Sequence, residues 1–315
     1  MTLNKSSRIF IAGHNGMVGS SILRIFKKKK YQKIFTINRK ELDLLDQKKT
    51  YNYLKEIKPD FVIIAAAKVG GIWANQNYKA EFIYENLLMQ SNLIHGSYLS
   101  GVKKLIFLAS SCIYPRLADQ PIKESYLLDG KLEPTNDAYA IAKIAGIKMC
   151  EAYNQQYKLN YLSLMPTNMY GPNDNYDLEN SHFFPALIKK IYHSKINKKN
   201  IIKIWGNGKA KRELMFVDDL ANACEFFLKK KVNHTIINIG SGQEKTILGF
   251  CKYIMKKLNC NFKIELDTSK PNGTPRKILD CTLAKSYGWR SKYSLEQGFK
   301  VTFQNYINKN LFVKN

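Results

Sequence analysis

The fold is decided by the stretch Arg8-Ile9-Phe10-Ile11-Ala12-Gly13-His14-Asn15-Gly16-Met17-Val18-Gly19, which lies near the start of the chain. An apolar run leads into three glycines at the spacing G-x-x-G-x-x-G, and an apolar segment with a helical pattern follows at residues 20–26. A phosphate-binding turn requires this order, because glycines let the backbone approach a pyrophosphate at the positive end of a helix. The spacing alone is a weak signal, and a plain strand-to-helix turn is the alternative. Its place between a strand and a helix favours a dinucleotide-binding turn.

The segments that follow repeat this alternation of strand and helix. Further strands are expected at residues 33–39, 60–67, 104–109 and 161–165, and helices are expected from residue 43, over 80–99 and from Asp137. The runs at 60–67 and 104–109 are almost continuously apolar, which is typical of strands buried on both faces of a sheet. We therefore predict an α/β protein with a doubly wound parallel sheet of the Rossmann type.

The regular alternation of predicted strands and helices ends at Pro172. Residues 173–181 are polar, a strand is expected at 201–206, and residues 269–277 form a basic loop rich in proline and glycine. Residues 216–240 read as a helix and a strand that return to the first sheet. We expect a first domain over residues 1–172, rejoined by 216–240, and a smaller α/β C-terminal lobe over residues 173–315.

The end of the second strand bears on the kind of dinucleotide. In NAD-binding proteins an acidic residue usually stands there and holds the ribose 2′-hydroxyl, whereas this chain carries Arg39. A guanidinium suits a 2′-phosphate, so NADP is favoured over NAD. A solvated arginine at the end of a strand is the alternative.

Tyr139 and Lys143 stand four residues apart on the predicted helix that begins at Asp137, and therefore share one face of it. A free tyrosine titrates near pH ~10, and a fixed ammonium beside it stabilises the phenolate. The pair is thus a candidate acid/base group. By spacing alone, one packed ring and one solvated amine would be the commoner outcome.

Composition narrows the possible partners. The 315 residues carry a formal net charge of +25, but the lysines are spread along the whole chain. We therefore interpret the charge as a compositional habit expressed on solvated faces and expect no nucleic-acid partner; an anionic partner such as a nucleotide substrate is the alternative. The six cysteines form neither a C-x-x-C pair nor a zinc-like cluster with histidine, so we expect no metal and reduced thiols. No segment resembles a signal peptide or a membrane span, so a cytoplasmic protein without membrane contact is expected.

A set of motifs runs through essentially the whole chain. It comprises residues 11–14, Ala65-Ala66-Ala67-Lys68-Val69-Gly70-Gly71-Ile72, Ser110-Ser111-Cys112-Ile113-Tyr114-Pro115, and residues 133–136, 139–146, 165–172, 216–219 and 269–277. In this order they resemble the extended short-chain dehydrogenase/reductase superfamily and, within it, the GDP-L-fucose synthase family. The cysteine motif and the Ala-Lys-Val-Gly-Gly run are specific to that family.

This resemblance implies two chemistries in one pocket. NADPH would reduce C4 of a GDP-4-keto-6-deoxy-mannose, with Tyr139 as proton donor, Lys143 lowering its pKa, and Ser110 bonded to the ketone oxygen. Cys112 and His182 would move the acidic protons at C3 and C5, because a thiol and an imidazole both exchange protons near neutral pH. Judged singly, a core cysteine, a packed histidine and a strand-end serine would be the ordinary interpretations.

The resemblance also implies binding residues. Those for NADP(H) are Gly13, His14, Asn15, Gly16, Met17, Val18, Gly19, Arg39, Leu42, Asp43, Leu44, Leu108, Ala109, Ser110, Ser111, Lys143, Pro166, Thr167, Asn168, Met169 and His182. Those for the GDP-sugar are Lys190, Trp205, Arg212 and Asn272. Asn15, Trp73 and Asn272 depart from the family pattern. A homodimer through the helices around 80–99 and 138–157 is implied as well.

Two other functions compete with this interpretation. A relative acting on another GDP-4-keto sugar, such as a 6-deoxy-heptose or colitose precursor, would share these residues and could perform C4 reduction alone. A regulator that only binds the dinucleotide should lack the complete set of Ser110, Tyr139 and Lys143, which is present here.

Overall fold

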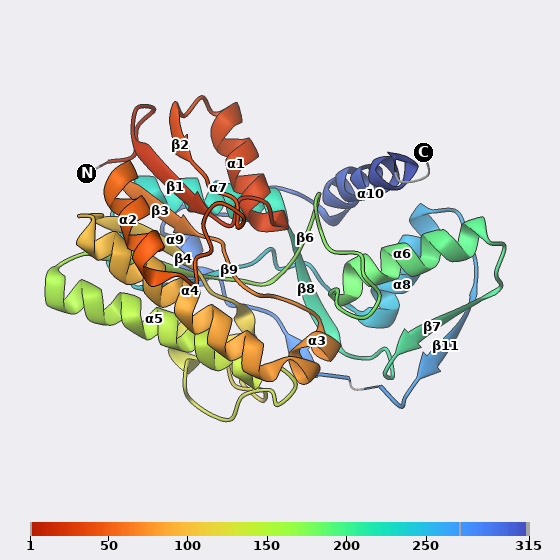
Figure 1. Ribbon diagram of the computed structural model, residues 1–315. Helices are drawn as coiled ribbons and strands as arrows, with labels where there is room; N and C mark the ends of the chain where they lie inside the picture. The colour runs from red at the N-terminus through yellow and green to blue at the C-terminus, as the bar shows by residue number, and fades with distance from the viewer. Residues whose placement is uncertain (1, 271, 313–315) are drawn as a thin grey trace.

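The computed structural model describes residues 2–270 and 272–312 and is built around a parallel sheet of six strands (Figure 1). The strands follow the order β2-β1-β3-β4-β5-β9, and every neighbouring pair runs parallel. Their bounds are β1 Arg8–Ala12, β2 Lys33–Phe35, β3 Phe61–Ile64, β4 Lys104–Leu108, β5 Asn160–Pro166 and β9 Ile236–Ile239. Every residue of β3 and β4 is buried, which confirms the interpretation of their continuous apolar runs. The predicted doubly wound parallel sheet is confirmed.

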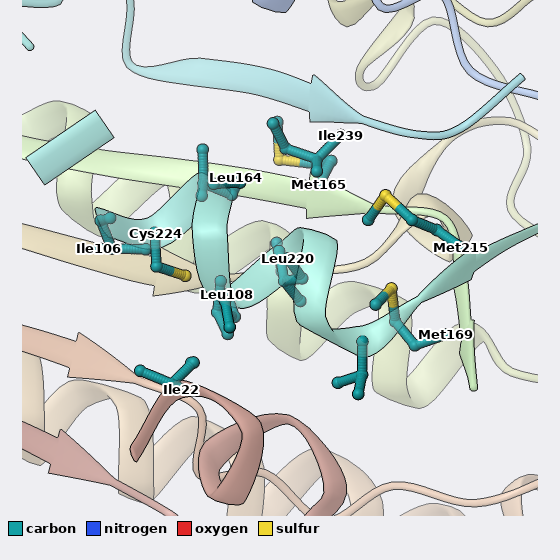
Figure 2. Packing of buried hydrophobic residues seen from close by; sticks show 14 of the residues in the cluster. Ile22, Ile106, Leu108, Leu164, Met165, Met169, Met215, Leu220, Cys224 and Ile239 are labelled. Atoms are coloured by element: carbon teal, nitrogen blue, oxygen red, sulfur yellow. The ribbon is translucent and has the colours of Figure 1, made fainter. Parts of the chain in front are cut away.

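Helices cover both faces of this sheet, as Figure 1 shows. One layer contains α1 (Met17–Lys28) and α7 (Val217–Lys229), which contact each other; the other contains α2 (Gln47–Ile57), α4 (Lys79–Leu99) and α5 (Asp137–Tyr157). In α1 the side chains of Ile22, Ile25 and Phe26 are buried, at the spacing that places them on one face. Figure 2 shows Leu220 of α7 and Leu108 of β4 within the resulting core.

The remaining strands form smaller sheets. Strand β8 (Lys211–Phe216) pairs in parallel with β6 (Asn168–Tyr170) and β12 (Arg276–Lys277) and antiparallel with β10 (Glu244–Thr246), while β7 (Ile201–Trp205) pairs in parallel with β11 (Lys263–Asp267). The helices α6 (Phe183–Ile196) and α8 (Ile247–Lys257) contact each other, and the chain adds α3 (Ile72–Asn77), α9 (Thr282–Ser286) and α10 (Leu295–Phe312). Within the described ranges, none of the helices has the length and apolar character needed to cross a bilayer.

Three predicted boundaries were too wide. Strand β2 ends at Phe35 rather than residue 39, because the Glu41 carboxylate bonds the amide of Asn38 and closes a turn there. Helix α2 begins at Gln47 rather than residue 43, since Asp46 caps it by accepting the Lys49 amide. Strand β3 ends at Ile64, and the glycine turn packs against the backbone that follows. Pro271 of the predicted basic loop lies outside the described residues.

Candidate active site

A cavity of about 230 Å³ opens at the carboxyl edge of the main sheet. The wall on the sheet side comes from the segments after β4 and β5 and from the first turn of α5. The opposite wall comes from the start of α6, from β7 and β8, and from the chain around β12. The predicted residues that line it are Ser110, Cys112, Tyr139, Asn168, His182, Lys190, Trp205, Arg212 and Asn272.

Cys112 lies in a short 3-10 turn directly after β4. Ser110 precedes this turn, and its Oγ accepts the amide N–H of Cys112 at 3.4 Å, so the hydroxyl and the thiol are held next to each other. Burial raises the pKa of the Cys112 thiol, while Lys277, the Ser110 hydroxyl and Lys143 act in the opposite direction. The thiol is therefore buried but surrounded by groups that favour its anion.

Tyr139 and Lys143 lie in the first two turns of α5, as their spacing predicts. The Lys143 Nζ stands 5.8 Å from the centre of the Tyr139 ring and donates a 2.9 Å hydrogen bond to the carbonyl of Leu108. Burial lowers the pKa of Lys143 to about 8. We expect Lys143 to lower the pKa of Tyr139, but in the structure burial, with Cys112 acting in the same direction, raises it.

His182 precedes α6 as its N-terminal cap residue, and Gly71 packs against the segment that leads to it. The amide of Gly71 donates to the carbonyl of Asn180 at 2.8 Å, and a Cβ on Gly71 would lie 2.3 Å from the carbonyl oxygen of Ser181. Only glycine lets these two segments approach so closely. Burial and the positive charge of Lys277 lower the pKa of His182 to about 4, so its imidazole is neutral at pH 7.

The opposite wall of the cavity carries cations around an aromatic ring. The Nζ atoms of Lys190 and Lys270 stand 5.5 and 5.4 Å from the centre of the Trp205 ring. Arg212 donates to the carbonyl of Asn272 at 3.4 Å, and burial lowers its pKa to about 10, so it stays charged at neutral pH. These groups suit an anion attached to a flat base or a sugar.

The glycine turn lies outside this cavity, at the carboxyl end of β1, and it fits a pyrophosphate. Gly13 has a φ of 85° and packs against the backbone of Ala66, so the protein itself requires glycine there. At Gly16, by contrast, a Cβ would come no closer than 3.6 Å to another atom of the protein. The space beside Gly16, at the start of α1, is therefore free for a ligand whose phosphates accept the first helical amides. The buried Nδ1 of His14 also finds no hydrogen-bond partner within residues 2–270 and 272–312.

Arg39 lies beside this turn, because Asn15 donates a 2.8 Å hydrogen bond to the side chain of Asn38. Its side chain is 73% exposed and forms long ion pairs with Asp43 at 3.6 Å and Glu85 at 3.9 Å. It is therefore free to turn toward a 2′-phosphate.

Most of the other predicted cofactor residues belong to the packed interior, whereas the side chain of Asp43 is 44% exposed. Thr167, for example, donates to the carbonyl of Glu213 at 3.2 Å and helps to join β5 to β8. The buried ones are Leu42, Leu108, Ala109, Ser111, Pro166, Thr167 and Met169, while Met17, Val18 and Leu44 are partly buried against the core.

Sequence reasoning missed several residues that line the cavity. Lys277 lies at the end of the basic loop and acts electrostatically on both Cys112 and His182. Glu133 lies two residues before Thr135 in a motif that we noted without assigning a role. The sequence does show an isolated acidic residue, Glu133, and a basic loop that ends at Lys277. Nothing in the order of the residues indicates that these two segments lie next to each other in the fold. The other missed residues include Asn75, Thr135, Asn136, Glu179 and Thr274.

Comparisons with known proteins agree with this geometry. Residues 9–240 match the NAD dependent epimerase/dehydratase family. The chain is 48% identical over 305 residues to putative GDP-L-fucose synthase 2 of Arabidopsis thaliana, covering 97% of this chain and 93% of that one. It is 45% identical over 311 residues to GDP-L-fucose synthase of Escherichia coli strain K12, covering 95% and 96%. It is also 42% identical over 307 residues to GDP-L-colitose synthase of Yersinia pseudotuberculosis, covering 96% and 98%.

Solved structures show the same likeness. MlghC, a GDP-mannoheptose C4 reductase from Campylobacter jejuni with NADP bound, superposes with a TM-score of 0.88 at 34% identity, covering 97% of this chain and 99% of that one. A GDP-L-fucose synthetase from Naegleria fowleri bound to NADP superposes with a TM-score of 0.89 at 28% identity, covering 98% and 95%. By its motifs, its fold and these relatives, the chain belongs to the NAD dependent epimerase/dehydratase family and, within it, to the group of GDP-L-fucose synthases.

Proposed function

We propose that this protein is an NADPH-dependent enzyme that epimerises GDP-4-keto-6-deoxy-D-mannose at C3 and C5 and reduces it at C4 to GDP-L-fucose. The observation that carries the proposal is one cavity that holds Ser110 and Tyr139 together with Cys112 and His182. A ketone reduction needs only the first pair. The thiol and the imidazole supply the two proton-transfer groups that an epimerisation needs. The identity of 45–48% to GDP-L-fucose synthases over almost the full chain supports this substrate.

The reduction uses the residues on the sheet side. When bound, NADPH supplies the hydride that adds to C4. The Ser110 hydroxyl donates to the ketone oxygen, and Tyr139 gives that oxygen a proton as its negative charge develops. Lys143, held by the Leu108 carbonyl, places a positive charge near the tyrosine and favours its deprotonated form. Substrate and cofactor would also keep water out of the site and strengthen these interactions.

The epimerisation uses the thiol and the imidazole. C3 and C5 both flank the ketone, so removal of a proton from either carbon gives an enolate whose oxygen Ser110 can hold. One group must take the proton and another must return one on the opposite face. Cys112 follows β4 whereas His182 caps α6, so the two reach the cavity from different elements.

The binding of the GDP moiety is assigned to the wall across the cavity. Arg212 suits the diphosphate, because a guanidinium can donate two parallel hydrogen bonds to phosphate oxygens. Lys190 adds positive charge next to Trp205, whose ring offers a flat apolar surface. Asn272 is oriented by accepting the amide of Asn207 at 2.8 Å. We propose that residues 173–315 form the substrate lobe, and that residues 1–172 with 216–240 form the NADP-binding domain.

A second candidate substrate is another GDP-4-keto sugar. The similarity of the chain, over almost its full length, to GDP-L-colitose synthase and to a GDP-mannoheptose C4 reductase supports this second candidate. The residues that handle the ketone and the diphosphate would be the same, so the choice rests on the shape of the cavity around the rest of the sugar.

We further propose a homodimer in the cytoplasm. Helices α4 and α5 pack side by side on one outer face (Figure 1), and Tyr84 and Ile141 on them are 62% and 48% exposed. A second copy would cover these apolar side chains. All six cysteines are free thiols, which suits a reducing compartment. Because the lysines are spread along the whole chain, we assign the net positive charge to solvated faces and propose no nucleic-acid partner. Light scattering would test the dimer.

The test is NMR of GDP-4-keto-6-deoxy-D-mannose incubated with the protein and NADPH in D₂O. The proposal predicts GDP-L-fucose carrying deuterium at C3 and C5. Oxidation of NADPH without deuterium would instead identify a C4 reductase. Bound NADPH without any reaction would point to a different keto sugar, which the heptose analogue would then test.

A further inference from the structure

Glu133 is a buried carboxylate in a cavity that we assign to an anion. Its side chain is 8% exposed, and it lines the same cavity as Cys112 and His182. A carboxylate is unfavourable both in a buried place and next to a diphosphate, unless other groups compensate its charge. Its presence therefore calls for an explanation.

The contacts of Glu133 join two distant parts of the chain. Its Oε1 accepts the hydroxyl of Thr135 at 3.1 Å, next to the start of α5. Its Oε2 accepts the hydroxyl of Thr274 at 3.3 Å and pairs with the Nε of Arg116 at 3.3 Å. Thr274 belongs to the segment that leads into β12. Glu133 thus fastens this segment, and the lysine that follows it, to the part of the molecule that carries Tyr139.

The strand pairing explains why a negative charge is needed there. Strand β12 runs beside β8, and in this register Lys277 stands opposite Arg212. Two cations side by side in a buried cavity repel each other and lose hydration. Glu133 acts on both with the opposite sign of charge.

We propose, on the basis of the function assigned above, that Glu133 is a positioning residue of this site. Its carboxylate holds residues 272–277 in place through Thr274 and compensates the charges of Lys277 and Arg212, so that both cations face the substrate. Lys277 in turn stabilises the negative charge that appears on Cys112 and on the substrate during the proton transfers.

The groups that act on Lys277 set the sign of the pH effect. Burial lowers the pKa of Lys277 to about 8; Cys112 raises it, Arg212 lowers it, and Glu133 and Glu213 raise it. Removing the charge of Glu133 therefore lowers this pKa further, and Lys277 loses its proton at a lower pH. Since the cation of Lys277 lowers the pKa of Cys112, loss of that cation raises the pKa of the thiol.

The test compares Glu133→Gln with Glu244→Gln. Glu244 is a matched control. Its carboxylate pairs at 2.7 Å with Arg276, which neighbours Lys277 in β12, but Glu244 does not line the cavity. The first readout is the rate of Cys112 alkylation by iodoacetamide between pH 6 and 9, corrected with a Cys112→Ser protein; it needs no substrate. Glu133→Gln should slow alkylation near pH 7 by about tenfold, the effect of one pKa unit, whereas Glu244→Gln should match the wild type.

The second readout is deuterium exchange at C3 and C5 as a function of pH. Glu133→Gln should move the basic limb of the profile to lower pH, and Glu133→Asp should restore it in part. Thr274→Val removes the hydrogen bond from Thr274 to Glu133 but keeps the charge of Glu133. It should therefore raise KM by about threefold and leave the basic limb of the pH profile unchanged. If Glu133→Gln does not fold, Glu133→Asp takes its place and should show a smaller shift of the basic limb to lower pH together with a raised KM, whereas Glu244→Gln should show neither.

Two kinds of failure are distinguishable. Alkylation rates and pH profiles of Glu133→Gln that coincide with those of Glu244→Gln would overturn the role of Glu133. A wild-type protein that exchanges no deuterium would overturn the proposed function, while the alkylation series would still decide whether Glu133 controls the charge around Cys112.

Discussion

The cofactor edge and the substrate cavity are assembled in different ways. The cofactor edge consists of short segments that each follow one strand of the main sheet, and all of these strands are parallel. The cavity combines residues 110–112, 133–139, 182–212 and 272–277, which come from both the main sheet and the smaller ones. Local motifs are therefore enough to locate the first region. The second depends on how distant segments pair.

Within the cavity, the largest expected effect separates the two proposed chemistries. Tyr139→Phe removes the proton donor for C4 and should lower reduction by about 10²–10⁴-fold while leaving deuterium exchange at C3 and C5 in place. Cys112→Ser should do the reverse. NADPH oxidation measured by absorbance and exchange measured by NMR provide the two rates. Equal loss of both rates in both variants would show that the residues do not divide the work.

The next effect tests whether the cavity depends on the close approach of two loops. Gly71→Ala places a Cβ 2.3 Å from the carbonyl oxygen of Ser181 and must displace the neighbouring His182. A shift of about 1 Å can lower a rate by roughly 10²-fold, so exchange should fall by that order. NADPH binding, measured by fluorescence, should change little because the glycine turn lies elsewhere.

A matched control for this variant is Gly130→Ala. The nearest atom to a Cβ at this position is the Pro115 Cβ at 3.3 Å, which can shift slightly. Its exchange rate should stay close to that of the wild type. Unchanged exchange in Gly71→Ala would mean that His182 is not held by this contact.

A smaller effect is expected at the cofactor edge. Arg39 is exposed and only weakly paired, so Arg39→Ala should not disturb the fold. Loss of a charged hydrogen bond to the 2′-phosphate costs about 1.5–3 kcal/mol, which corresponds to a loss of NADPH affinity of at least roughly tenfold. Titration with NADH is the control, since it lacks this phosphate. Equal weakening of both cofactors would remove Arg39 from this role.

How far the sequence could predict the molecule follows from the same comparison. The glycine turn, the continuous apolar strands and the Tyr139–Lys143 spacing are local patterns, and each lies where it was predicted. Arg212 and Lys277 are 65 residues apart in the numbering yet stand opposite each other, because β12 adds to β8 in one particular register. Such a short strand carries no periodic signal, so neither the position of Lys277 nor its link to Glu133 could be derived beforehand.

The pKa of Tyr139 could not be predicted from the sequence either. The spacing of Tyr139 and Lys143 correctly placed them on one face, but burial raises the pKa of the tyrosine rather than lowering it. Burial depends on the complete fold.

The smallest predicted effect concerns stability. The pKa of Lys277 is about 8 in the folded protein, whereas its ordinary value, taken for the unfolded chain, is 10.5. Below pH 8 the lysine is charged in both states, and burial of its charge then destabilises the folded state. This penalty is relieved as the pH rises from about 8 to 10.5, where the folded protein releases the proton first. Lys277→Met should therefore raise the melting temperature at pH 7 by about 3 °C, and the gain should shrink toward pH 10. A gain that grows with pH would contradict the assigned burial of this charge.

The claim that one cavity serves both chemistries is tested most directly by inhibition with GDP. If deuterium exchange and C4 reduction use the same diphosphate site at Arg212, GDP should inhibit both with one inhibition constant, and Arg212→Gln should raise that constant equally for both. Two different constants, or an effect of Arg212→Gln on one reaction alone, would show that the two reactions occur at separate places and would contradict the account.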